Sequence, residues 1–325
     1  MNIVVQKYGG TSVENKEKLE KICSRIIEYK EKGNGMVIVV SAQGKMTDNL
    51  IKMANDYVKD PDSKFLDVLL STGEMQTAAL LSMMLAEKGY KCSCLTSGMT
   101  GIITTSEYGN AKIKNVSPVV ILNSLKEDNI VIVSGFQGMD RFGNITTLGR
   151  GGSDLSATAI ASAIKADKCE IYTDVDGVLT ADPKVIENAK LLENISYSEM
   201  LEAASNGAKV LHNRCVSFAR KNDLDIAIKN SQTSSRGTLV TKATLNEKAE
   251  IKVITKKDNL TKISLISDMI SETKELFSKV FTLSESLNIP IEMISFSEIS
   301  LNIIVDTKHA NILITQLHKL FLENS

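Results

Sequence analysis

The sequence lacks, or has few of, the residue types and segments that characterise several classes of protein. Its 325 residues include no tryptophan and only four prolines, and the formal net charge is −1. A balanced charge gives no reason to expect nucleic acid or a polybasic membrane contact. No apolar run approaches the roughly 18 residues of a membrane span, and the sequence opens on a strand-like segment rather than a signal peptide. We therefore expect small-molecule partners, no nucleic acid, no membrane and a cytoplasmic location.

Cysteine and histidine are also scarce, with five and three residues. The cysteines are odd in number and lack C-x-x-C spacing, so neither a disulfide framework nor a zinc site is predicted. The histidines are scattered, which gives little support to a metal site or a catalytic triad. We expect reduced, mostly buried thiols and no metal site formed by the chain. These residues are Cys23, Cys92, Cys94, Cys169 and Cys215, and His212, His309 and His318.

What the sequence does contain is a recurring pattern of strand-like apolar runs with helix-like stretches between several of them. Such alternation predicts an α/β fold, a mainly parallel sheet sandwiched by helices, with ligands at the carboxyl ends of the strands. The runs are Ile3–Val5, Met36–Val40, Cys92–Leu95, Ile130–Val133, Glu170–Thr173 and Leu224–Ile228.

The pattern changes after Thr238, where a polar, linker-like stretch precedes a short self-contained segment. That segment predicts a strand, a helix, a strand pair and a final helix, in the order of a ferredoxin-like α+β module lacking its last strand. We place the boundary near residue 245, giving domains 1–244 and 245–325. The expected elements are 262–266, 272–287, 291–294, 299–305 and 310–322.

The segment Lys7–Ser12 joins the first strand to an amphipathic stretch and has the composition of a phosphate site. Helix N-termini carry unpaired N–H groups and partial positive charge. Gly9 and Gly10 allow close backbone approach, Thr11 and Ser12 add hydroxyls, and Lys7 supplies a charge. The alternative is a tight turn with an exposed lysine.

Better-known nucleotide signatures are not present. A Walker loop would need glycine where Val39 stands, five residues before Gly44 and Lys45. The dinucleotide fingerprint fails at Asp154, which occupies a position for glycine or alanine. No protein-kinase catalytic loop is found. Any nucleotide is therefore bound in another way.

A second glycine-rich segment, Gly149–Asp154, precedes an apolar helix expected to run to about Lys165. Ser153 or Asp154 would serve as its N-cap, and the glycines again suit an anion. Arg150 beside such a cradle offers a planar fork for carboxylate or phosphate. The alternative is a solvent-exposed arginine in a flexible turn.

Polar residues also follow two other strands. Thr173, Asp174 and Asp176 follow one, where they could contact a ribose, an adenine or a metal-bearing phosphate, or simply form a β-turn. Ser41 and Thr47 follow another, and their hydroxyls could fix a carboxylate. Gly73, Glu74 and Gln76 are expected at the start of the next helix, where Glu74 would pair with a substrate amine or merely complement the helix dipole.

These motifs, in this order, resemble the aspartate kinases of the amino acid kinase superfamily over nearly the whole chain. The likeness to the lysine-sensitive monofunctional type is greatest. It implies the amino acid kinase fold and transfer of the ATP γ-phosphoryl group to the β-carboxylate of L-aspartate, the first step of lysine, threonine and methionine biosynthesis. The matching segments are Lys7–Ser12, Ser41 with Thr47–Leu50, Ser71–Glu74, Ser134–Gly138, Gly149–Asp154, Tyr172–Pro183 and Gly207–His212.

The resemblance also assigns roles. It implies a catalytic set, an aspartate-binding set in which Arg150 clamps the α-carboxylate, and a nucleotide-binding set, with Mg²⁺ carried by ATP. The aspartate β-carboxylate is ionised at neutral pH, since its reference pKa is about 3.9, so no general base is required. The catalytic set is Lys7, Asp154 and Lys209; the aspartate set is Ser41, Thr47, Glu74, Arg150 and Ser153; the nucleotide set is Lys7, Gly9, Gly10, Ser12, Tyr172, Thr173, Asp174, Lys184 and Lys209.

The C-terminal segment resembles an ACT domain, which implies an amino-acid effector, lysine rather than threonine, and a homodimer or higher homo-oligomer. Relatives usually carry two ACT units, one inserted in the other, whereas this chain has room for one, so the effector and feedback stay open. Asn213 also replaces the usual proline after His212. The alternatives are a sibling kinase of glutamate, acetylglutamate or UMP, and a non-catalytic amino-acid sensor. The implied effector residues are Ser267, Asp268, Met269, Ser271, Ser297, Glu298 and Ile299.

Overall fold

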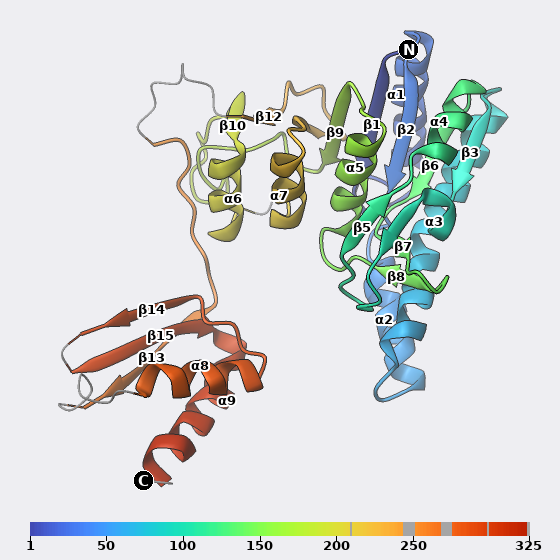
Figure 1. The fold of residues 1–325 in the computed structure, drawn as a ribbon. Coiled ribbons are helices and arrows are strands. Elements are labelled where there is room, and N and C mark those ends of the chain that lie inside the picture. Colours follow the sequence, from blue (N-terminus) through green and yellow to red (C-terminus); the bar gives the residue numbers. More distant parts are fainter. Residues whose placement is uncertain (209, 243–250, 268–274, 298, 324–325) are drawn as a thin grey trace. The chain divides into compact units, whose positions relative to one another are not determined.

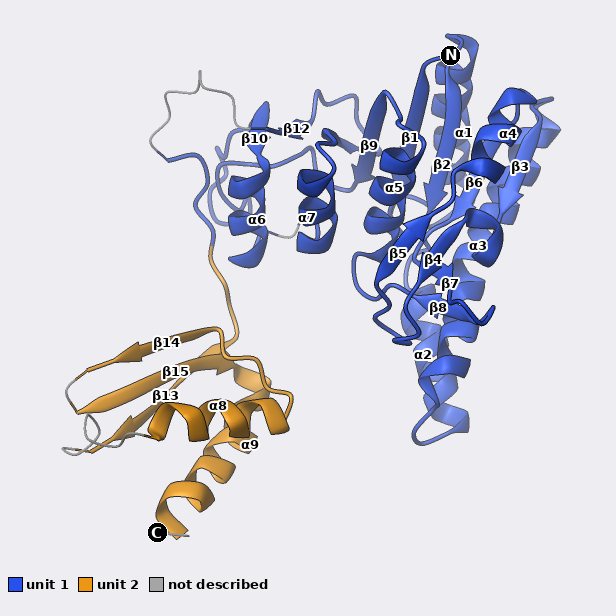
Figure 2. Cartoon of the chain, viewed as in Figure 1, with its two compact units in different colours: residues 1–255 blue, residues 256–325 orange. Residues whose placement is uncertain are grey.

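The computed structural model describes residues 1–325 apart from 209, 243–250, 268–274, 298 and 324–325 (Figure 1). The chain forms two compact units, Met1–Thr255 and Lys256–Ser325 (Figure 2). The expected boundary at 244/245 falls among residues outside the description. Beyond it, the Ile254 N–H donates to the Thr180 carbonyl, and Val253 packs against a core cluster of the first unit. The first unit therefore extends to Thr255, about ten residues past the expected boundary.

A mainly parallel sheet forms the centre of the first unit. Among the described residues it has eight strands, and all neighbours are parallel except β11 and β12. The expected parallel α/β sheet is confirmed, and all six predicted apolar runs overlap strands of this sheet, namely β1, β2, β3, β6, β9 and β11. In spatial order the strands are β10 (Asn194–Ser196), β12 (Thr238–Thr241), β11 (Ile226–Asn230), β9 (Lys168–Thr173), β1 (Ile3–Tyr8), β2 (Gly35–Val40), β6 (Ile130–Ser134) and β3 (Cys92–Leu95).

Helices cover both faces of this sheet, which explains the continuous apolar runs of β2 and β6, strands buried at every position. Alternate residues of β2 point to opposite cores: Ile38 packs with α1 and α3, and Val39 packs with α4 and α5. A third cluster lies under α6 and α7. These helices are α1 (Lys16–Glu31), α3 (Ser63–Glu87), α4 (Val119–Lys126), α5 (Gly152–Ala163), α6 (Tyr197–Ser205) and α7 (Asn213–Lys221).

A second sheet of four short strands lies within the same unit and was not predicted. Its order is β5-β4-β7-β8, and its strands contain only three or four residues each. Segments this short, with polar residues among them, carry little periodic signal. The remaining elements of this unit are α2 (Met46–Tyr57), the 3₁₀ helix η1 (Ser97–Thr100), β4 (Ile102–Thr104), β5 (Ile113–Val116), β7 (Gln137–Met139) and β8 (Ile145–Thr147).

Helix α3 differs most from expectation. It has 25 residues and begins at Ser63, so Glu74 lies in its middle and not in its first turn as predicted. By length and composition α3 could cross a membrane, although the sequence reading found no such run. Here it buries Leu81 and Leu85 against the sheet and carries buried Asp67 and Glu74, as a core helix does.

The described residues of the C-terminal unit form a three-stranded antiparallel sheet with two α-helices. The strand order is β13-β15-β14, the order of a ferredoxin-like α+β module, and no fourth strand lies beside β13 among the described residues. Leu301, Ile303 and Val305 alternate inward from the central strand and pack on Val280 and Leu313 of the helices. The elements are β13 (Leu260–Ile266), α8 (Leu276–Ser286), β14 (Met293–Phe296), β15 (Ser300–Asp306), α9 (Thr307–His318) and the π-helical turn η3 (Lys319–Glu323).

Candidate functional site

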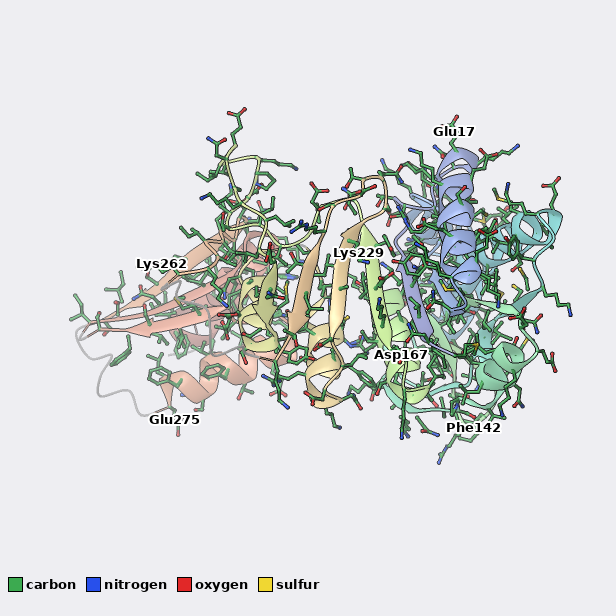
Figure 3. The ribbon with its side chains drawn as sticks, turned by 90° about the horizontal axis from the view of Figure 1, so that it is seen from above. Glu17, Phe142, Asp167, Lys229, Lys262 and Glu275 are labelled. Atoms are coloured by element: carbon green, nitrogen blue, oxygen red, sulfur yellow. The ribbon has the colours of Figure 1, made fainter. Side chains whose placement is uncertain are left out.

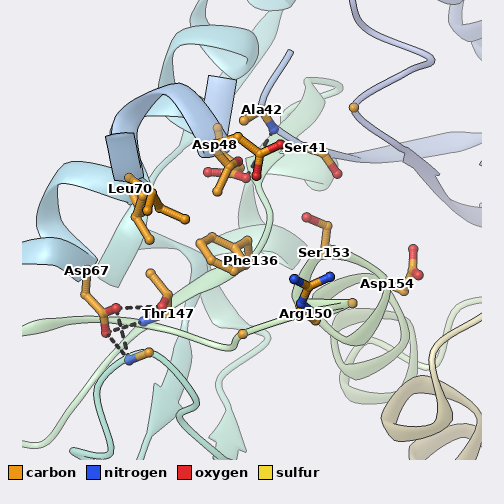
Figure 4. A pocket seen from close by; sticks show the side chains of 18 of the residues that line it. Ser41, Ala42, Asp48, Asp67, Leu70, Phe136, Thr147, Arg150, Ser153 and Asp154 are labelled. Atoms are coloured by element: carbon orange, nitrogen blue, oxygen red, sulfur yellow. Dashed lines mark hydrogen bonds between the residues drawn. The ribbon is translucent and has the colours of Figure 1, made fainter. Parts of the chain in front are cut away.

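A cavity of about 580 Å³ opens in the first unit where β1, β2 and β6 end (Figure 4). Its wall also includes the first turn of α5 and residues of α2 and α3. Carboxyl ends of parallel strands are where α/β folds bind ligands. The cavity brings together eight residues that the sequence assigned to the catalytic, aspartate and nucleotide sets, namely Lys7, Gly10, Ser41, Thr47, Glu74, Arg150, Ser153 and Asp154.

Lys7 and Asp154 form a largely buried ion pair in this cavity. Lys7 lies at the end of β1, paired in register with Val39 of β2 and Ile171 of β9. Its Nζ lies 2.6 Å from Asp154 Oδ1, and the two side chains are only 11% and 13% exposed. A cation held this way is aimed by its partner, and phosphate oxygens could share its remaining donors.

The first turn of α5 is a helix N-terminus beside the cavity, which is the kind of position that favours anions. Its N-cap is Gly151, at φ 70°, without a side-chain capping bond, so the expected N-cap role of Ser153 or Asp154 is wrong. Both lie inside the helix, which leaves the Ser153 hydroxyl and the Asp154 carboxylate free to face the cavity (Figure 4). A side chain at Gly151 would collide with His212, so glycine is required there.

The Lys7–Ser12 turn lies tightly against neighbouring loops. The Gly9 N–H donates to the Tyr172 carbonyl at 3.3 Å, and the Gly44 N–H donates to the Gly10 carbonyl at 3.0 Å. Ser12 is buried, and its hydroxyl has no hydrogen-bond partner in the part of the chain that the structure describes. A buried hydroxyl without a partner is costly unless a ligand completes it, which fits the expected phosphate contact.

Glu74 projects from the middle of α3 into the cavity and is 3% exposed. Its Oε1 accepts a hydrogen bond from the Ala42 backbone N–H at 3.1 Å, while its buried Oε2 has no partner among the described residues. Burial raises its pKa from 4.5 to about 7, because the bond from Ala42 offsets only part of the desolvation. Such a carboxyl is suited to receive a cationic amine.

Phe136 and Asp67 line the same cavity and were missed by sequence reasoning. Phe136 follows β6 in the left-handed conformation at φ 69°, an uncommon one for an aromatic residue. Asp67, 1% exposed, accepts bonds from the Thr147 N–H at 2.8 Å, the Thr147 hydroxyl at 2.6 Å and the Gly109 N–H at 3.0 Å. Burial raises the Asp67 pKa despite these bonds. In the sequence, the only sign of a role for Asp67 is that this aspartate stands within an apolar helical run.

Apart from Lys7 and Gly10, the described residues of the nucleotide set lie outside the cavity wall. Thr173 and Asp174 follow β9, and the Thr173 hydroxyl donates to Asp174 Oδ1 at 3.1 Å. The Tyr172 ring is 3% exposed and stacks on Tyr8 at 4.8 Å, so it belongs to the core. Lys184 is exposed, and Lys209 lies outside the described residues.

Asp176, in the loop after β9, is engaged by residues at the end of β11. Its Oδ1 accepts bonds from the Asn230 amide at 2.8 Å and the Thr233 hydroxyl at 3.0 Å. This carboxylate therefore ties the loop after β9 to the segment after β11, and Asp174 is the more available acid at that end of β9.

The described effector-set residues come together in the C-terminal unit. The Ser267 N–H donates to the Ile299 carbonyl at 3.0 Å, which joins the end of β13 to the turn before β15. In that turn the Ser297 and Ser300 hydroxyls lie 2.7 Å apart. Asp268, Met269, Ser271 and Glu298 lie outside the described residues.

The first unit has a mainly parallel α/β sheet and a cavity lined by glycine-rich loops, a lysine and an arginine. Together these features define the site of a phosphotransferase. Residues 2–230 match the model of the amino acid kinase family. The chain belongs to this family, and within it to the aspartokinases.

The relatives that support the narrower assignment share most of the chain. The aspartokinase of Geobacillus stearothermophilus is 43% identical over 90% of this chain and 72% of its own. Aspartokinase 2 of Bacillus subtilis (strain 168) is 42% identical over the same shares, 90% and 72%. The structure of E. coli aspartokinase III in complex with aspartate and ADP superposes with a TM-score of 0.77 at 26% identity, covering 94% of this chain and 79% of that one.

Proposed function

We propose that this protein is an ATP-dependent aspartate kinase, which transfers the γ-phosphoryl group of ATP to the β-carboxylate of L-aspartate to give 4-phospho-L-aspartate. One observation carries the proposal. A single cavity holds a buried lysine for phosphate, an uncompensated glutamate for an amine and an exposed arginine for a carboxylate, namely Lys7, Glu74 and Arg150. An amino acid with a second carboxylate and ATP together require those three groups.

The acceptor would be held at both of its α-substituents. Arg150 would bind the α-carboxylate with its planar fork, and Glu74 Oε2 would accept from the α-ammonium. Ser41, Thr47 and Ser153 border the same space and offer hydroxyls to the carboxylates. Fixing both ends of the backbone leaves the β-carboxylate directed at the phosphate, so much of the rate enhancement comes from orientation.

The phosphoryl group would move between two anions, so the site must neutralise charge. Lys7, with Lys209, would contact the transferred group, while the Gly10 N–H and the N–H groups of the first turn of α5 would stabilise phosphate oxygens. Asp154 would aim the lysine. Thr173, Asp174 and Lys184 would contact the nucleoside side, with Tyr172 supporting them from the core.

We propose that ATP enters as its Mg²⁺ complex, since phosphoryl transfer needs charge neutralisation at the β- and γ-oxygens. The Ser12 hydroxyl and the Asp174 carboxylate are oxygen groups of the type that Mg²⁺ and its water ligands contact. Activity should disappear with EDTA and return with excess Mg²⁺. Full activity in EDTA would contradict this requirement.

A coupled ADP-release assay across aspartate, glutamate, acetylglutamate and UMP tests the acceptor. ADP release with aspartate alone is the expected result. Activity with glutamate but not aspartate would assign the protein to a sibling kinase. Aspartate binding without ADP release would favour the amino-acid sensor.

We further propose that the C-terminal unit is ACT-like and binds an amino-acid effector, lysine rather than threonine, near Ser267, Ser297 and Ile299. The backbone bond between Ser267 and Ile299 brings those segments together. Titrating the kinase with lysine and threonine, separately and together, tests this, and inhibition by threonine alone would overturn the choice.

We also expect a homodimer or higher homo-oligomer, which light scattering would detect. The five free cysteines favour the cytoplasm as the location of the protein.

A further inference from the structure

Arg214, in the first turn of α7, reaches across to two loops that lead to the acceptor site. Its Nη1 donates to the Asn110 side-chain oxygen at 3.0 Å and to the Leu148 carbonyl. Its Nη2 donates to the Ala111 carbonyl at 2.8 Å. One guanidinium thus ties α7 to residues 110–111 and to the residue directly before Gly149.

His212, the N-cap of α7, packs against the other end of the segment that begins at Leu148. A side chain on Gly151 would collide with the His212 ring, which shows how closely His212 packs there. Between the two contacts lie Gly149 and Gly151, at φ 74° and 70°, with Arg150 between them. Glycines do not hold a backbone direction on their own, so outside contacts must do so. His212 and Arg214 therefore bracket Arg150.

Asp67 also holds the two loops that Arg214 contacts. From α3 it accepts bonds from the N–H groups of Gly109 and Thr147, next to the two segments that Arg214 holds. Arg214 itself is not part of the cavity wall, whereas Asp67 and Arg150 are. Any influence of Arg214 on the acceptor must therefore pass through the loops.

We propose that Arg214 is a positioning residue for the acceptor site: it fixes the backbone on which Arg150 is mounted, so that the Arg150 guanidinium meets the substrate α-carboxylate. The inference rests on the proposed function. Arg214 would thereby link α7, the helix after residues 207–212, to the loop that would bind the acceptor. Three charge-assisted bonds from one rigid fork suit this task, because lysine could not satisfy all three acceptors in the same geometry.

The experiment compares Arg214→Ala, Arg214→Lys, Asn110→Ala and the double variant Arg214→Ala/Asn110→Ala. Arg220→Ala is the matched control, since Arg220 is exposed on the same helix. Losing bonds to a charged group changes binding by roughly tenfold. The KM for aspartate should therefore rise about tenfold in Arg214→Ala and less in Arg214→Lys and Asn110→Ala, with kcat and the KM for ATP nearly unchanged.

The double variant separates positioning from general stability. If Asn110 acts only through Arg214, its removal adds nothing in the Arg214→Ala background. Fully additive effects on the KM for aspartate would overturn the proposal, as would an unchanged KM accompanied by a lower Tm. The Arg220→Ala control should match the parent protein.

Hydrogen exchange supplies a readout that does not depend on activity. Amides of residues 147–152 should exchange faster in Arg214→Ala than in Arg220→Ala, because the loop loses its tie to α7. Equal exchange in the two variants would overturn the proposal even if the parent protein failed to phosphorylate aspartate. Such a failure would by itself reject only the proposed function.

Discussion

Lys7 and Asp154 are 147 positions apart in the sequence, yet their side chains meet at 2.6 Å, where the end of β1 lies beside the start of α5. Each is largely buried, so neither charge is compensated by water. Removing one partner of such a pair leaves the other charge buried and unpaired, which is more costly than removing both.

Lys7→Ala should therefore lower both activity and stability, by different routes. Loss of one charge-stabilising group at a phosphoryl centre costs about 10²–10³ in kcat. The free energy of unfolding should also fall, by up to about 3 kcal/mol, because Asp154 loses its partner. Steady-state kinetics and urea unfolding measure the two effects.

The double variant Lys7→Ala/Asp154→Ala distinguishes these routes. It should regain much of the lost stability and none of the activity. Lys16→Ala is the control, because the Lys16 side chain is 84% exposed. Wild-type turnover in Lys7→Ala would refute the role given to this lysine.

Glu74 should make aspartate binding depend on pH near neutrality. Its pKa is raised to about 7 by burial, so the free enzyme gains the Glu74 charge as the pH rises through that value. The ionised form attracts the substrate ammonium, so the KM for aspartate should fall from pH 6 to pH 8. A KM profile measured for Glu74→Gln should lose this dependence, and an unaltered profile would exclude Glu74 as the amine partner.

The same group should affect stability in the opposite direction. Between pH 4.5 and about 7 the folded protein keeps a proton that the unfolded chain has lost, so the free energy of unfolding falls as the pH rises. The loss should be about 3 kcal/mol over that window. Urea unfolding of the parent protein and Glu74→Gln at pH 5 and pH 8 gives the difference. Glu87→Gln, at the exposed end of the same helix, should retain the parental trend.

Glu170 should be a major determinant of the stability of the first unit. Its carboxylate, 2% exposed, accepts bonds from Gln6 at 2.9 Å, Tyr172 at 3.1 Å, Tyr29 at 3.2 Å and Lys229 at 2.6 Å. Figure 3 labels Lys229, which lies on β11. The carboxylate thus joins β1, β9, β11 and α1.

Glu170→Ala should lower the free energy of unfolding by about 3–5 kcal/mol, because it leaves several buried donors and a lysine without their acceptor. Glu170→Gln should cost less, since the amide retains an acceptor oxygen. The control is Glu28→Ala, whose pair with Lys32 is exposed on both sides and should contribute little to stability because solvent screens it. Equal losses in Glu170→Ala and Glu28→Ala would contradict this account.

Local chemistry explains which parts of the site the sequence could predict. Lys7, Gly10 and Arg150 stand beside glycines at predicted strand or helix ends, so their role can be inferred from neighbours in the chain. Asp67 could not be inferred, because its partners Gly109 and Thr147 are 42 and 80 positions away. Long-range partners leave no periodic mark in a sequence.

The start of α3 and the N-cap of α5 were predicted wrongly for similar physical reasons. The start of α3 was placed too late because this helix buries residues on several sides and lacks a clean apolar stripe. The N-cap of α5 was assigned to Ser153 or Asp154 because these residues favour that position, whereas close packing on His212 selects Gly151. The predicted parallel sheet was right because strands such as β2 and β6 are nearly continuous apolar runs.

Gly10 provides a test of how closely its turn must fit against the loop that follows β2. A Cβ built there would lie 2.8 Å from the Ala42 carbonyl oxygen and 3.4 Å from that of Gly44, and both are backbone atoms that cannot rotate away. Gly10→Ala should force these loops apart, with a loss of about 1–3 kcal/mol in stability. Because Ala42 also binds Glu74, a displacement near 1 Å should lower kcat/KM for aspartate roughly 10²-fold. Gly35→Ala is the matched control, since the nearest atoms to its new methyl group belong to the flexible side chain of Met1 and not to the backbone. Retention of the parental kcat/KM in Gly10→Ala would mean that the loops tolerate separation, and that the contact between the Gly10 turn and Ala42 does not set the geometry of the site.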